Sequence, residues 1–143
     1  MSISPLPSPT RADEALLALR PVISAAPEQD APSAGHFLHT TLRPVLKLQN
    51  ELLLQVVADF VHDHHMPLPR LAVADQERQL AELLARNTKL RYSIIGLVSG
   101  MFTSAEYQFY RAHRPEINRR LLELAQRRVL DQVAEVMQLL KAA

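Results

Sequence analysis

Between Leu80 and Met101, apolar residues recur at alternating spacings of three and four, and this pattern constrains the fold more than any other feature. One heptad position is held by Leu80, Asn87, Ile94 and Met101, and a second by Leu83, Leu90 and Leu97. Such spacing forms one stripe of an α-helix, suited to packing lengthwise against another helix. We therefore expect a helix from about Asp75 to Ser99. Its polar seam residue, Asn87, is of the kind that fixes helix register or partner number.

The composition also favours an all-α fold. The 143 residues are 48 % hydrophobic and 22 % charged, as in an ordinary globular domain, and only three are glycine. The chain has no cysteine, which excludes disulfides, thiolate nucleophiles and cysteine-ligated metals. No apolar stretch approaches the ~20 residues that cross a bilayer. We expect a cytoplasmic protein with no membrane partner and no cofactor.

Proline divides the chain into a tail and a domain. Six of the ten prolines precede residue 36, so the sequence predicts a mobile, Pro-rich tail over residues 1–35 and a single helical-bundle domain over residues 36–143. Within the tail, a short helix over residues 11–20 can be capped by Thr10 and stopped by Pro21. This helix either docks on its own domain or binds another protein.

The first long helix is expected from Leu42 to His62, with Pro44 tolerated in its first turn. Apolar side chains cover most of its circumference, so it must be buried on more than one side. Either the tail helix or a second subunit is expected to cover it.

Two further helices complete the predicted fold. Thr103 and Glu106 form a capping box, with Phe102 and Tyr107 placed as the hydrophobic staple of a short helix that ends near Ala112. A last helix follows Pro115, with an apolar stripe at Leu122, Ala125, Val129, Val133, Val136 and Leu140. The prediction is an antiparallel bundle of three long helices plus one short connecting helix.

The apolar faces favour a non-enzymatic protein–protein interaction module, as a homodimer. The predicted oligomer interface consists of Leu46, Leu53, Val57, Phe60, Leu83, Asn87, Leu90 and Ile94. No nucleophile-elbow pattern, phosphate-binding loop or zinc-protease motif is present, and no catalytic residue is assigned.

Charge supports an alternative function. Residues 83–128 contain nine Lys and Arg against three Asp and Glu, a surface that can neutralise nucleic-acid phosphates while tyrosines stack on bases. The residues proposed for this role are Arg86, Lys89, Arg91, Arg119, Arg120 and Arg127. Three other interpretations stay open: surface ion pairs such as Glu116 with Arg120, contact with the acidic first half of a neighbouring subunit, or binding of another anionic ligand.

Histidines give a second alternative, a metal site or a small helical enzyme. His62, His64 and His65 cluster beside Asp63 after the first long helix, and imidazole with carboxylate suits divalent metals. A solvent-exposed loop explains the same cluster, and no nucleophile or orienting partner is apparent.

Overall fold

The computed structural model describes residues 12–21 and 33–142, and within those ranges the regular structure is entirely helical. The long helices that the sequence predicts are present as shorter segments. In chain order these are α1 (Asp13–Leu19), α2 (Ala34–Phe37), the π-helix η1 (Leu38–Leu42), α3 (Arg43–Leu48), α4 (Asn50–Asp63), the 3₁₀-helix η2 (Leu68–Arg70), α5 (Val73–Arg86), α6 (Thr88–Ser99), α7 (Ser104–Ala112), α8 (Arg114–Leu130) and α9 (Val133–Ala142).

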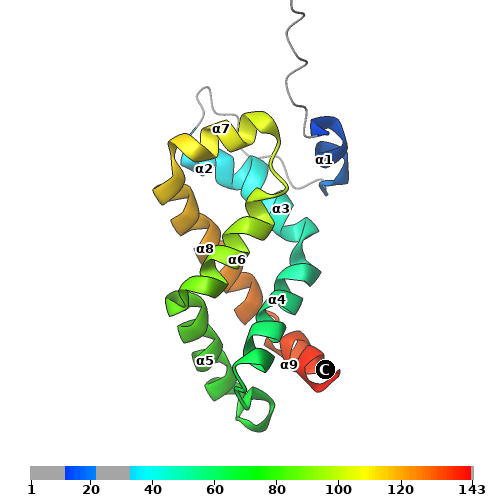
Figure 1. Ribbon diagram of the computed structural model, residues 1–143, viewed down its shortest axis with the longest axis vertical. Coiled ribbons are helices and arrows are strands. Elements are labelled where there is room, and N and C mark those ends of the chain that lie inside the picture. Colours follow the sequence, from blue (N-terminus) through cyan, green and yellow to red (C-terminus); the bar gives the residue numbers. More distant parts are fainter. Residues whose placement is uncertain (1–11, 22–32, 143) are drawn as a thin grey trace, which may run out of the picture.

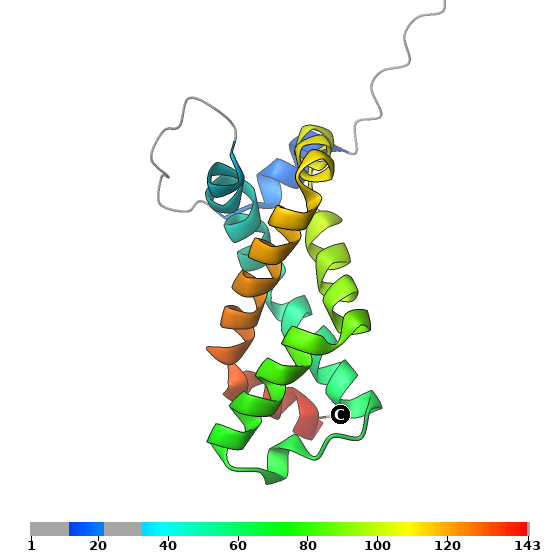
Figure 2. The ribbon, with the colours of Figure 1, turned by 90° about the vertical axis from the view of Figure 1, so that its left-hand side faces the viewer.

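The segments form an elongated bundle. α3–α4 and α8 run one way along the long axis and α5–α6 runs back beside them, while α7 crosses one end beside α2 (Figures 1 and 2). α9 packs closely on α4 toward the opposite end. None of the described helices is both long and apolar enough to cross a bilayer.

The first long helix begins earlier than predicted and contains a wider turn. Ser33 caps α2 by accepting a hydrogen bond from the His36 amide, and the helical path continues through η1 into α3. Pro44 therefore lies inside this path rather than in its first turn. A proline ring clashes with the carbonyl four residues before it, and the π-turn immediately upstream accommodates that clash.

The chain itself covers the apolar surface of α4. Leu53, Val57 and Val61 are fully buried, and α4 packs on α6, α8 and α9. The two covers that the sequence suggested, the tail helix and a second subunit, are not needed to explain this burial.

The seam between Leu80 and Met101 belongs to two helices rather than one. Asn87 has extended backbone angles (φ −79°, ψ 111°), ending α5 and starting α6. Leu80, Leu90 and Ile94 are nonetheless fully buried, because both halves of the seam face the same core.

The C-terminal region agrees in part with the prediction. Thr103 and Glu106 form the capping box, and α7 ends at Ala112 as expected. Phe102, the expected staple residue, is fully buried and packs edge-to-face on Tyr110 at 5.6 Å between ring centroids. The expected last helix is interrupted at Asp131 and Gln132, so that it becomes α8 and α9.

The predicted tail helix corresponds to α1, which begins at Asp13 after Ala12. Thr10, its expected cap, lies outside the described residues, as does most of the predicted tail. α1 buries none of its residues, and Leu17 and Leu19 are more than half exposed. Polar contacts therefore have to hold it in place.

Candidate anion-binding pocket

A small hollow lies where the junction of α5 and α6 meets α8. Its volume is about 240 Å³, and its lining consists of Arg86, Thr88, Arg91, Tyr92, Ile95, Asn118 and Leu122. Two of these residues are arginines and none is a carboxylate. The break in the seam creates this arrangement, because it brings the last residue of α5 and the first residue of α6 to the same place.

The guanidinium of Arg91 is held by the end of α5. Its Nη1 atom donates to the carbonyl oxygens of Leu84 at 3.2 Å and Ala85 at 2.8 Å. These carbonyls lie in the last turn of α5, where backbone oxygens lack helical partners. A guanidinium has five N–H donors, so this anchoring leaves others for a ligand.

Asn118 contributes a further donor from α8. Its Oδ1 accepts a hydrogen bond from the Tyr110 hydroxyl at 2.7 Å, so its amide nitrogen is the group that can donate. The N-terminus of α6 adds positive potential at Thr88, because the first amides of a helix have no intrahelical acceptor. The donors around the hollow thus favour an anion.

Tyr92 gives the hollow an aromatic edge. It is 67 % exposed, the largest exposure among the big apolar and aromatic side chains of the described residues. An exposed ring beside cations is the usual platform on which single-stranded bases stack.

The structure separates the six basic residues predicted for nucleic acid into different environments. Arg86 and Arg91 line the hollow, and Lys89 is exposed in the first turn of α6. Arg119 pairs with Glu123 at 3.0 Å and Arg120 with Glu116 at 3.3 Å, so both carry helix-surface ion pairs. Arg127 is exposed on α8 and does not line the hollow.

Arg86 also borders a second hollow of about 470 Å³ on the side of α5. Arg78, Gln79 and Glu82 line it together with Met66, Leu83 and Asn87. Arg78 forms an ion pair with Asp75, and Glu82 places a carboxylate in the lining. This second hollow is therefore less suited to an anion than the first.

The predicted oligomer interface lies mostly inside one chain. Leu46, Leu53, Val57, Leu90 and Ile94 are at most 1 % exposed, while Phe60, Leu83 and Asn87 are partly exposed. The first five side chains contact the core of their own chain and present no surface to a partner.

Asn87 has a different role from the one its heptad position suggested. Its side-chain Oδ1 accepts a hydrogen bond from the Leu90 amide at 3.0 Å, which makes it the N-cap of α6. An amide side chain that satisfies the backbone in this way favours a helix start over a helix interior.

The predicted histidine cluster stays on the surface. His62, His64 and His65 are exposed, and the His64 ring stacks on Phe60 with its Nδ1 atom 2.9 Å from the Phe60 carbonyl oxygen. Among the residues with described positions, no three His, Asp or Glu side chains are grouped to hold a metal ion.

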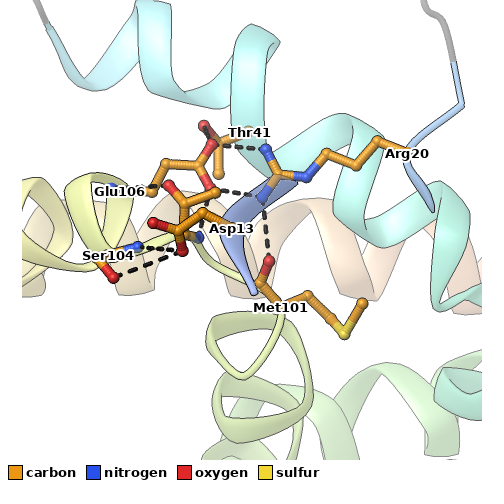
Figure 3. A network of polar contacts seen from close by, with 7 residues as sticks. Asp13, Arg20, Thr41, Met101, Ser104 and Glu106 are labelled. Carbon is orange, nitrogen blue, oxygen red and sulfur yellow. Dashed lines mark hydrogen bonds and ion pairs between the residues drawn. The ribbon is translucent and has the colours of Figure 1, made fainter. Parts of the chain in front are cut away.

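A partly buried polar cluster attaches α1 to the N-terminus of α7 (Figure 3). Arg20 binds both carboxylate oxygens of Glu106, with Nη1 at 2.6 Å from Oε2, and also donates to the Met101 carbonyl at 3.0 Å. Thr41 donates to the same carboxylate at 2.9 Å. Asp13 accepts a hydrogen bond from the Ser104 amide at 3.0 Å. We call Arg20, Glu106, Thr41, Asp13 and Ser104 the α1 clamp.

Glu106 is the centre of the α1 clamp. Burial raises the pKa of this carboxyl, but hydrogen bonds from Arg20, the Thr103 amide and the Thr41 hydroxyl outweigh it and bring the pKa below the ordinary value. Glu106 is therefore ionised at neutral pH, and its charge is matched by the guanidinium.

In its described residues the protein is therefore an all-α protein with a small basic pocket on its surface. No protein-family model, curated protein or solved structure matches the chain.

Sequence reasoning missed several of these residues for identifiable reasons. Asn118 lies about 30 residues from the α5–α6 junction, and nothing in its local pattern connects the two. Arg20 and Glu106 are 86 residues apart. Asn87 was detectable in part, since asparagine is among the preferred N-cap residues.

Proposed function

We propose that the protein is a non-enzymatic binding protein that holds single-stranded nucleic acid at the hollow between α5, α6 and α8. The observation that supports this most is a lining with Arg86, Arg91 and the exposed Tyr92 ring but no carboxylate. The guanidinium groups would neutralise a phosphate while the tyrosine ring stacks on the adjacent base.

The neighbouring surface extends this site. Lys89 is exposed directly after the lining residue Thr88, with no ion-pair partner among residues 12–21 and 33–142. Three cations in one place can contact about three phosphates. For a single strand this predicts a slope of about −2 when log affinity is plotted against log salt.

Fluorescence anisotropy with a labelled oligothymidylate tests the proposal. We expect micromolar binding at low salt, and a loss of about tenfold in Arg86→Glu and in Tyr92→Ala. Arg70→Glu is the matched control, because Arg70 is an exposed cation separated from Arg86 by the length of α5, about 20 Å. Absence of binding at low salt, or an equal loss in the control, contradicts the proposed function.

Self-association stays a separate prediction. Five of the eight residues on which the sequence based it are buried in one chain, so a homodimer would have to rely on other surfaces. Molar mass measured by light scattering across a range of protein concentrations tests it directly.

A further inference from the structure

A second candidate binding surface lies between α4 and α9, and its charged residues are acidic, whereas those of the first hollow are basic. Two hollows of about 560 and 230 Å³ share the lining residues Gln55, Leu139 and Ala142. Together they follow one face of α4 from Asn50 to His62, a length of about 18 Å. We call this surface the α4–α9 groove.

The floor of the groove is apolar. Leu54 and Ala58 from α4 are 5 % exposed, and Leu139 and Ala142 from α9 complete the strip. Because the strip follows helix spacing on α4, it matches a guest whose own apolar side chains recur at i, i+3, i+4 and i+7.

The rim of the groove is acidic. Glu51, Asp59 and Glu135 line it, and none of the three forms an ion pair with another described residue. The one basic-type side chain in the lining is His62, and the remaining polar rim consists of uncharged amides such as Gln55 and Gln138. Three unpaired carboxylates around an apolar strip are complementary to a cationic, amphipathic partner.

The head of the groove is rigid. Asn50 and Gln132 exchange two side-chain hydrogen bonds, at 2.8 and 2.9 Å, and Arg128 donates to Asn50 at 3.2 Å. These bonds fix the start of α4 to the end of α8 and to the link that leads into α9, without a guest. A preformed site loses less conformational freedom on binding.

We infer that the α4–α9 groove is a docking site for a basic amphipathic helix of a partner protein. The apolar face of the guest lies on Leu54 and Leu139, and its Lys or Arg side chains meet Glu51, Asp59 and Glu135. This interaction is independent of the nucleic-acid site, because the two surfaces share no lining residue.

The test uses a synthetic helical peptide with leucines at i, i+3, i+4 and i+7 and lysines at its other positions. We expect micromolar binding in fluorescence anisotropy, weakened about tenfold by the double charge reversal Glu51→Lys with Glu135→Lys. The matched control is Glu77→Lys with Glu82→Lys, two exposed carboxylates on α5, which should leave the affinity within about twofold.

Three results would overturn the inference. The first is no binding of the peptide to the unmodified protein. The second is a result that means nonspecific attraction. Either a scrambled peptide of the same composition binds as tightly as the designed one, or the control double variant weakens binding as much as Glu51→Lys with Glu135→Lys. The third is a concentration-dependent dimer that the Glu51→Lys and Glu135→Lys variant dissociates, which would make a second copy of the chain the occupant. Circular dichroism of each variant confirms that the fold is retained.

Discussion

Leu90 and Arg20 are both almost removed from solvent, yet the groups around them have little in common. Leu90 is fully buried among apolar side chains of the bundle core. Arg20 has a side chain that is 7 % exposed; it binds the Glu106 carboxylate, which also accepts from Thr41, and it donates to the Met101 carbonyl. The core is stabilised by apolar burial, which is non-directional and insensitive to pH. The α1 clamp depends on a charged pair whose geometry and ionisation must both be correct.

This difference predicts that the two regions can be lost separately. Removal of a core side chain should affect the whole bundle. Removal of a clamp group should release α1 and leave the helices from α3 to α9 folded, because α1 contributes no buried residue to the core.

The largest expected effect is that of Leu90→Ala. Truncating a fully buried leucine removes apolar contacts and leaves a cavity, which should lower the free energy of unfolding by about 2–5 kcal/mol. Urea unfolding followed by circular dichroism measures this change. If Leu90→Ala instead altered only the molar mass in solution, the residue would lie at a subunit interface and the assignment to the core would be wrong.

The next effect is that of Glu106→Gln. This change leaves the buried guanidinium of Arg20 without a counter-charge, which should weaken α1 docking by about 1–3 kcal/mol. Hydrogen exchange should show loss of protection in α1 and near-native protection in α4 and α8.

The matched control for the clamp is Glu116→Gln. It removes the more exposed ion pair with Arg120 and should change stability by less than about 0.5 kcal/mol. A global loss of protection in Glu106→Gln would show that the α1 clamp is not separable from the core.

A smaller effect distinguishes two roles for Asn87. As a polar residue in a continuous seam it would lower stability, and Asn87→Leu would be stabilising. As the N-cap of α6 it stabilises, so Asn87→Leu should cost about 0.5–2 kcal/mol. Thermal unfolding decides between them, with Asn87→Asp, which keeps a capping oxygen, as the variant expected to retain stability.

The smallest effect is the response of the α1 clamp to mild acid. The pKa of Glu106 is lowered from its ordinary value of 4.5 in the folded protein. Its contribution is therefore complete above pH 4.5 and is lost as the pH falls through the lowered folded pKa, while Arg20 stays charged. The protection factors of the α1 amides, corrected for the intrinsic pH dependence of exchange, should be unchanged from neutral pH to about pH 5 and should fall only as the pH drops below 4.5. Release of α1 at a pH above 5 would contradict this assignment.

The parts of the fold that sequence predicted are those with local causes. The capping box at Thr103 and Glu106 spans four residues, so its geometry follows from the immediate sequence. The apolar stripe of Ala125, Val129 and Val136 follows from helical periodicity, which survives the interruption at Asp131 and Gln132. An all-α fold was predictable for the same reason.

The parts that sequence did not predict depend on contacts between distant segments or on small backbone changes. Apolar spacing continues on both sides of Asn87, so a continuous helix and two helices that share a core give the same pattern. The hollow beside Tyr92 exists only because this break faces Asn118 on α8. Two of the six predicted cations, Arg119 and Arg120, form ion pairs with Glu123 and Glu116. The sequence allows these pairs at helical spacing but also allows other pairings of the same residues.

The π-turn at Leu38–Leu42 has a consequence for how the chain tolerates length changes. A π-turn contains one residue more than the α-helical turn it replaces. Deleting one residue there would replace the π-turn with an α-helical turn, restore the clash at Pro44 and rotate everything before it by about 100°. Phe37 now packs edge-to-face on Phe102 and stacks on Phe109. After such a deletion the Phe37 ring would point away from both rings. The extra residue of the π-turn therefore sets the rotation of α2 about its axis that brings Phe37 onto Phe102 and Phe109.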